Sequence, residues 1–215
     1  MRFSVYDELI SQATQNEADV VAARQVFEEL TGSVRPDHEL YNERSDAFIE
    51  WYLLERRGDD GRTPVERALL LATEPAPRAT LCSLRSAQRS LYRVQALRPG
   101  GLILDDLYGG GRFDVDERRR LPGVQVADLL DARLLADPDE PYRLVLGRAV
   151  LFHPREAAPT VLRLVREAKD RREPRSAVLN RLLRLRLRAL AYRHVSPARI
   201  YGELGERRPA GSATL

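Results

Sequence analysis

The sequence predicts an α+β fold, in which N-terminal helices and C-terminal helices flank a small antiparallel β-sheet or SH3/OB-like barrel. Three observations support this prediction. Apolar residues recur at helical spacing up to residue 87, five short segments with strand character follow without an intervening helix, and amphipathic helical periodicity returns after Pro154. The predicted regions are an acidic helical region at 1–87, a small β module at 88–153, an Arg-rich helical region at 154–206 and a flexible tail at 207–215.

Turn residues divide the start of the chain into helices. Good helix formers between Phe3 and Leu30 predict two short helices, which the polar pair Gln15-Asn16 separates. A densely apolar stretch at 40–54 predicts the core helix, because a turn rich in glycine and aspartate follows at 57–61.

A capping box predicts where the next helix begins. Thr63 is suited to the N-cap, the proline after it fits the first helical position, and Glu66 can reach back to the backbone N–H of Thr63. We expect this helix to run to about Thr73 and to be ended by Pro75 and Pro77.

A further short helix is expected through Leu81, Cys82 and Leu84, with Cys82 as a small core residue. Because Cys82 is the only cysteine, it cannot form an intramolecular disulfide, and a thiolate zinc site is excluded.

Five strands are expected in the β module. The segments alternate partly between apolar and polar residues, and turns at 98–101 and 109–111 and a proline-containing loop at 137–141 separate them. We interpret Gly109-Gly110-Gly111 as a hairpin tip rather than as an anion cradle, because it lies between two strands and not before a helix. The predicted strands are Leu91–Leu97, Leu102–Tyr108, Arg112–Arg118, Asp128–Leu135 and Tyr142–Phe152.

Two amphipathic helices are expected after the β module, at Thr160–Arg172 and Ser176–His194, with a break at Pro174. The second has one apolar face and one basic face. The basic side chains fall within an arc of about 60° at 100° per residue. We predict that these two faces bind a partner; their residues are Leu179, Leu182, Leu183, Leu187, Leu190, Arg181, Arg184 and Arg188.

Charge is distributed unevenly along the chain. The net charge of +3 conceals −8 over residues 1–60, +2 over 61–160 and +9 over 161–215. A basic end can bind nucleic acid or another polyanion, or it can pair with the acidic end of the same chain or of a second copy. We favour charge pairing together with solvated helix faces.

Several enzyme classes lack their essential residues. Lys169 is the only lysine and does not lie in a Walker A motif, and no serine lies in a Gly-x-Ser-x-Gly elbow. His38, His153 and His194 form no His-x-x-x-His pair, which excludes a zincin. We therefore expect neither an enzyme nor a cofactor. No apolar run is long enough for a membrane span, and residues 1–10 lack the pattern of a secretory signal, so a cytoplasmic location is expected.

Acidic and aromatic residues of the β module leave two alternatives open. Asp105, Asp106, Asp114 and Asp116 lie on the two arms of a predicted hairpin and could hold a divalent cation in a metal-dependent hydrolase, although alternation with apolar neighbours is typical of a half-solvated strand. Aromatic residues near arginines could stack on nucleic acid, but the nearly neutral charge of this segment favours a barrel core and rim. These residues are Tyr92, Tyr108, Phe113 and Tyr142, with Arg93, Arg112 and Arg143.

Four short motifs carry a resemblance to known proteins. Phe48-Ile-Glu-Trp51, Gly61-Arg-Thr-Pro64 and the β segments Leu104-Asp-Asp-Leu107 and Leu130-Asp-Ala-Arg-Leu134 resemble a pattern in uncharacterised bacterial proteins, some of which also carry a SEC-C zinc motif. The resemblance covers about residues 47–153 and implies a helical segment followed by a β module. The SEC-C cysteines are absent here, so the resemblance implies no metal, and because these proteins are uncharacterised it implies no activity.

We expect a non-enzymatic interaction or adaptor protein. Its leucine face would supply most of the binding energy for a protein partner or a second copy, and its arginines would set orientation and association rate. The alternatives are a nucleic-acid-binding regulator that uses the same basic helix, and the metal-dependent hydrolase.

Overall fold

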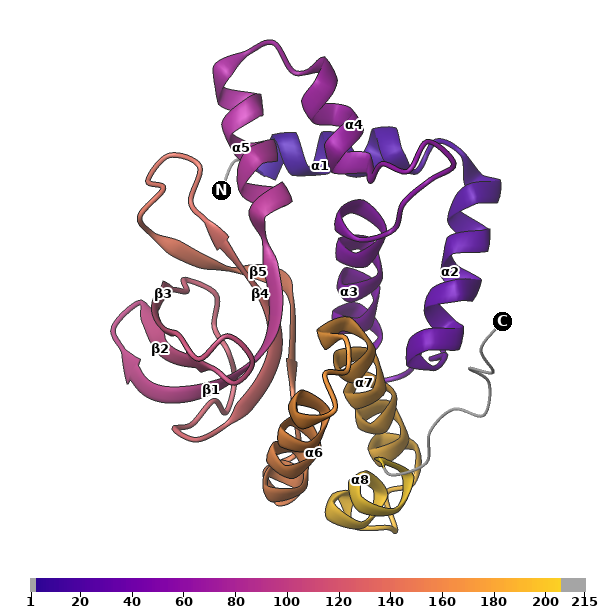
Figure 1. Ribbon diagram of the computed structural model, residues 1–215, viewed down its shortest axis with the longest axis vertical. Helices are drawn as coiled ribbons and strands as arrows, with labels where there is room; N and C mark the ends of the chain where they lie inside the picture. Colours follow the sequence, from indigo (N-terminus) through magenta and orange to yellow (C-terminus); the bar gives the residue numbers. More distant parts are fainter. Residues whose placement is uncertain (1–2, 206–215) are drawn as a thin grey trace.

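The computed structural model describes residues 3–205 and has the predicted α+β architecture (Figure 1). Within that range, helices precede and follow a five-stranded barrel. The elements are α1 (Phe3–Ala13), α2 (Glu17–Thr31), α3 (Tyr41–Leu54), α4 (Pro64–Leu71), α5 (Pro75–Ser86), β1 (Gln88–Arg98), β2 (Gly101–Asp106), β3 (Arg112–Asp116), β4 (Leu129–Ala136), β5 (Leu144–Phe152), the 3₁₀ turn η1 (Arg155–Ala157), α6 (Ala158–Asp170), α7 (Arg175–Ala191) and α8 (Pro197–Gly205). The tail predicted at 207–215 lies outside the described residues.

The strands close into a barrel in the order β1-β2-β3-β5-β4. Neighbouring strands are antiparallel except β3 and β5, which pair in parallel through Val115 with Leu144 and Asp116 with Val145. This Greek-key order corresponds to the OB-like form of the predicted barrel. Alternate residues point inward, so the interior is filled by Val94, Leu104, Val115, Leu130 and Leu146, among others.

Local signals place the helix starts where the sequence predicts them. Asn16 accepts a hydrogen bond from the backbone N–H of Asp19 and so separates α1 from α2. The capping box of α4 is complete. The backbone N–H of Glu66 donates to Thr63 Oγ1 over 3.3 Å, and the Glu66 carboxylate accepts from the N–H of Thr63 over 2.9 Å.

Three expectations about the helices are wrong. Pro75 and Pro77 do not end a helix but lie in the first turn of α5, where a missing N–H costs no hydrogen bond. Cys82 is exposed, because Leu81 and Leu84 are the residues of α5 that face the core. The helix predicted to reach His194 ends at Ala191, and α8 follows as a separate helix.

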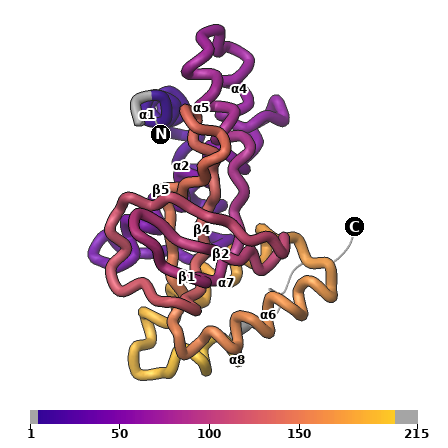
Figure 2. Tube along the Cα trace, turned by 90° about the vertical axis from the view of Figure 1, so that its left-hand side faces the viewer, coloured from indigo at the N-terminus to yellow at the C-terminus, as the bar shows by residue number. Residues whose placement is uncertain are grey.

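The predicted regions share their hydrophobic cores. One core joins α1–α5 with β4, β5 and α7, and it contains Phe48, Trp51, Leu135 and Leu183. A second core joins α6–α8 with the barrel residues Leu91 and Leu129. Both views place α1, α4 and α5 at one end of the molecule and α6 and α8 at the other (Figures 1 and 2). None of the helices in the described part of the chain is long and apolar enough to cross a membrane.

A buried carboxylate docks α3 on the barrel. Glu50 accepts hydrogen bonds from the backbone N–H groups of Arg148, over 2.6 Å, and Ala149, over 3.2 Å. Its other oxygen lies 3.3 Å from Nε of Arg133 on β4. Burial raises the pKa of Glu50, although Arg133 and the two N–H groups act in the opposite direction. Gly147 permits this approach, because a Cβ atom there would lie 2.5 Å from the Glu50 carboxylate.

A second buried ion pair fixes α7 against the barrel. Arg89 of β1 forms a bidentate pair with Asp131 of β4, with distances of 2.9 and 2.6 Å. Its third nitrogen donates to Oδ1 of Asn180 on α7 over 2.8 Å. The position of α7 is therefore set from both sides, by Asn180 and by its leucines.

Candidate binding cleft

The leucine face of α7 is not a free docking surface. Leu179 and Leu182 are 0% exposed and pack in the core with α6 and α8, whereas Leu183 and Leu187 are buried in the core with the N-terminal helices. Of the five predicted leucines, only Leu190 is half-buried. Four of the five leucines predicted to bind a partner are therefore covered by the two cores of the chain itself, and only Leu190 remains accessible.

The three predicted arginines have different surroundings. Nη1 of Arg181 pairs with Glu173 over 3.0 Å at the N-terminal half of α7. Arg184 donates to the backbone carbonyl of Glu29, and Arg188 is exposed. The shared basic face is thus divided between an ion-paired arginine and two arginines that line a cleft.

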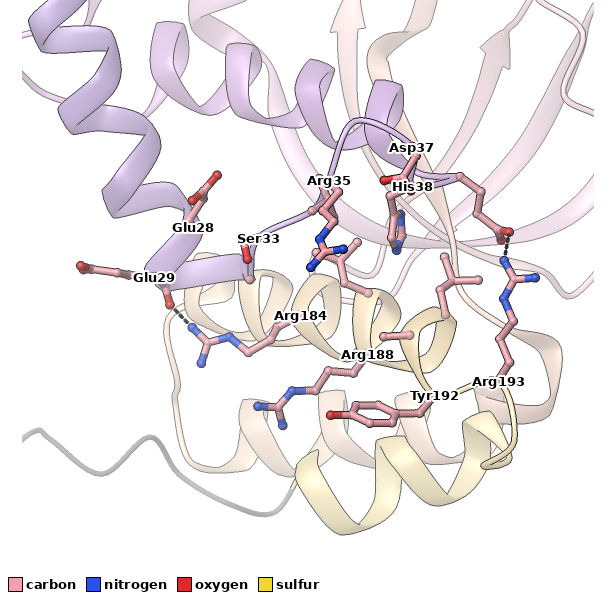
Figure 3. Close-up of a pocket in the computed structure, with 16 residues that line it drawn as sticks. Glu28, Glu29, Ser33, Arg35, Asp37, His38, Arg184, Arg188, Tyr192 and Arg193 are labelled. Carbon is pink, nitrogen blue, oxygen red and sulfur yellow. Dashed lines mark hydrogen bonds and ion pairs between the residues drawn. The ribbon is translucent and has the colours of Figure 1, made fainter.

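This cleft lies between the C-terminal end of α2, the connection to α3 and the C-terminal half of α7, and its volume is about 900 Å³. Arg35 enters it from the connection, and Arg184 and Arg188 enter it from α7 (Figure 3). Apolar and aromatic lining comes mostly from α7 and from the residues just after it. That part of the lining consists of Val34, Leu187, Leu190, Ala191 and Tyr192.

A buried arginine holds the wall of the cleft. Gly32 ends α2 with a φ of +89°, a conformation that favours glycine. Arg44 of α3, which is 2% exposed, donates to the Gly32 carbonyl from Nε over 3.1 Å and from Nη2 over 2.7 Å. Further along the connection, the backbone N–H of Leu40 donates to Nδ1 of His38 over 3.1 Å. The connection is therefore ordered by contacts within the chain.

The charges in the cleft are only partly paired. Arg193 pairs with Glu39 over 2.9 Å (Figure 3). The guanidinium groups of Arg35 and Arg188 have no hydrogen-bond or ion-pair partner within residues 3–205. Three further carboxylates line the same cleft and form no ion pair with Arg35 or Arg188 within the described residues, and they belong to Glu28, Glu29 and Asp37.

Three of the four aspartates considered as metal ligands pair with arginines, and the fourth is hydrogen-bonded within the barrel. Asp105 lies 2.7 Å from Nε of Arg112, and Asp114 and Asp116 both pair with Arg98. Asp106 is buried and accepts hydrogen bonds from Ser90 Oγ and from the N–H of Tyr108. No group of three or more His, Cys, Asp or Glu side chains in the described part of the chain could hold a metal ion. These aspartates therefore give the metal-dependent hydrolase no support.

The aromatic residues of the barrel serve mainly as core and rim. Tyr92 is buried and contacts Phe113 edge-on, with ring centroids 6.5 Å apart. Arg143 pairs with Asp116 and Glu140, and Arg112 pairs with Asp105. These two arginines of the predicted stacking surface are therefore already paired and are not free to bind the phosphates of a nucleic acid. Tyr142 is the exception, since it is 85% exposed.

Sequence reasoning identified Arg184 and Arg188 but missed Arg35 and Tyr192. No periodicity places the connection after α2 beside the end of α7, because that proximity depends on the tertiary packing of Leu183 and Leu187. The available signal was Gly32 and Pro36, which mark an ordered turn around Arg35.

The chain was also compared with models of protein families, with curated proteins and with solved structures, and none of the three comparisons gave a match.

Proposed function

We propose that this chain is a non-enzymatic binding protein that holds an acidic segment of a partner protein in the cleft between α2 and α7. The observation that carries the proposal is the pair of guanidinium groups without an ion-pair partner among the described residues, Arg35 and Arg188, which enter one cleft from two elements (Figure 3). Guanidinium groups bind carboxylates in bidentate geometry. Arg184 keeps donors for a ligand because a backbone carbonyl, and not a carboxylate, is its partner.

The lining of the cleft favours a peptide over a nucleic acid. Glu28, Glu29 and Asp37 would repel a continuous row of phosphates, whereas a peptide can place its carboxylates beside the arginines and other side chains elsewhere. Leu190 and the half-exposed ring of Tyr192 offer apolar contacts to such side chains.

A selection of displayed random peptides on the purified chain tests this proposal. We expect enrichment of peptides that combine Asp or Glu with an apolar residue. Arg35→Ala and Arg188→Ala should each weaken a selected peptide about tenfold in calorimetry, because each removes a charge-assisted hydrogen bond. Arg166→Ala is the matched control, since Arg166 is an exposed arginine on α6, away from the cleft.

Two outcomes would overturn the proposal. The first is a set of selected peptides without acidic residues, or with affinities that the cleft variants leave unchanged. The second is retention of random-sequence DNA or RNA that depends steeply on salt and is lost in Arg184→Ala and Arg188→Ala, which would indicate a nucleic-acid-binding protein instead.

A further inference from the structure

A group of buried polar atoms without partners lies at the N-terminal half of α7, apart from the cleft. These atoms are the hydroxyl of Tyr108, Nη1 of Arg175, and Nε and Nη2 of Arg181. All four can donate hydrogen bonds, and three belong to guanidinium groups. Buried donors without acceptors are costly, particularly when they are charged. A hydrogen-bond acceptor is therefore expected beside these four donor atoms.

Tyr108 places these groups near one another. It lies on the connection between β2 and β3, and the guanidinium carbon of Arg175 is 5.4 Å from its ring centroid. Burial raises the pKa of Tyr108, although the charges of Arg181 and Arg175 act in the opposite direction. The hydroxyl consequently stays protonated and can donate a hydrogen bond.

Arg175 and Arg181 have only one carboxylate partner between them, Glu173, among the ion pairs of the described residues. Glu173 is shared between Arg181, at 3.0 Å, and Arg171, at 2.8 Å. Arg175 stands at the first position of α7, in a first turn that has neither an acidic residue nor a side-chain cap. Lys169 adds a further positive charge, and its Nζ donates to the carbonyl of Leu107 over 3.2 Å.

Nearby acceptors are already used. Asp106 accepts from Ser90 and from the N–H of Tyr108, and Asp131 is held by Arg89. A water molecule could accept some of the free hydrogen bonds, but it would leave the charge of Arg175 unpaired and Arg181 with a carboxylate that it shares with Arg171. An anion satisfies the donors and the charges together.

We propose that Tyr108, Arg175 and Arg181 bind a tetrahedral oxyanion, either inorganic phosphate or the phosphoryl end of a larger ligand. Two guanidinium groups and one hydroxyl provide donors in several directions, which suits a phosphoryl group with several acceptor oxygens. The site does not depend on the function proposed for the cleft, because the two share no residue.

Thermal unfolding and calorimetry with sodium phosphate, at an ionic strength held constant with sodium chloride, test the site. We expect a saturable rise in Tm, because a ligand that binds only the folded state stabilises it. Arg181→Met should weaken phosphate binding about tenfold, since it removes a charge-assisted hydrogen bond, and Tyr108→Phe should weaken it less. Arg166→Met is the control for loss of an exposed arginine.

Glycerol 3-phosphate distinguishes the two sources of the phosphoryl group. Binding of the ester as well as of phosphate indicates a site open to the end of a larger ligand, whereas binding of phosphate alone indicates an enclosed site for the free ion. The proposal is wrong if phosphate raises Tm no more than sodium chloride does, or if Tyr108→Phe and Arg181→Met bind phosphate as tightly as the wild type. Tyr108→Phe keeps the ring packing and carries the test if Arg181→Met does not fold. Arg35→Ala and Arg188→Ala should retain the full phosphate response, which separates this site from the cleft.

Discussion

Arg44 stabilises the end of α2 that forms one wall of the cleft, because its buried guanidinium donates two hydrogen bonds to the Gly32 carbonyl. We expect Arg44→Ala to lower the free energy of unfolding by about 3 kcal/mol, since a buried acceptor and an unfilled volume are left behind. Urea unfolding measures this change. Arg166→Ala, at an exposed site, should change stability by less than about 0.5 kcal/mol. An equal effect of the two substitutions would contradict a holding role for Arg44.

His153 makes the stability of the protein depend on pH. Burial lowers the pKa of His153 to about 4; Asp131 acts in the opposite direction, and Arg186 and Arg89 act in the same direction. The unfolded histidine has a pKa of about 6.5, so below that pH the unfolded state takes up a proton that the folded state does not. We expect His153 to contribute a loss of about 3 kcal/mol in the free energy of unfolding between pH 7 and pH 4.

The substitution His153→Gln isolates this contribution. Other groups titrate in the same range, but they are common to both proteins, so the difference between wild type and variant reports on His153. Urea unfolding at several pH values should show the wild type losing more stability than the variant as the pH falls from 7 to 4. The prediction would be contradicted if the free energy of unfolding of wild type and variant fell by the same amount between pH 7 and pH 4.

At the scale of elements, Glu50 connects α3 with β5 through two backbone N–H groups and with β4 through Arg133. Glu50→Ala should lower the free energy of unfolding by about 3–5 kcal/mol, because it leaves two buried N–H groups without an acceptor and removes one of the two carboxylates that pair with the buried Arg133, the other being Glu55. Glu50→Gln should cost less, since its amide oxygen can still accept from the backbone. Hydrogen exchange at the amides of Arg148 and Ala149 should be faster in Glu50→Ala than in Glu50→Gln. If both variants exchange like the wild type, Glu50 does not hold the two elements together.

The sequence predicted the helices and strands better than it predicted which parts of the molecule pack against them. Asn16 and the capping box at Thr63 act locally, so their helix starts were found, and alternation found all five strands. An apolar face, however, does not indicate what covers it. The pattern of Leu179 and Leu183 is the same whether a partner or the chain itself packs against α7, and only the tertiary structure shows that the chain does.

At the scale of the whole molecule, the barrel depends on the helices around it. Leu91 and Leu129 pack against the C-terminal helices, whereas Leu135 and Leu151 pack in the core with the N-terminal helices. We expect the isolated fragment 88–153 not to fold, because these side chains would be exposed to water. Circular dichroism and amide chemical-shift dispersion, with the full chain as the reference, measure this. A fragment with native dispersion would show that the barrel is an independent domain.

Long-range charge pairing was the least predictable property of the molecule. The sequence showed that the ends carry opposite charge, but not that Arg193 pairs with Glu39 or that Arg148 pairs with Asp7. Arg35 and Arg188 remain without an ion-pair partner among the described residues as a result of the same packing. The candidate cleft was therefore only half predicted, by the arginines on α7.

Lys169, whose ammonium group contacts the Leu107 carbonyl, is the only lysine of the sequence. An amine-reactive reagent can consequently modify only one side chain of the sequence, in addition to the α-amino group. Because Leu107 precedes Tyr108, a fluorophore attached to Lys169 would stand next to the proposed oxyanion site. The native chain can thus be labelled at a single side chain, without any cysteine substitution, and a label on Lys169 would report directly on what enters that site.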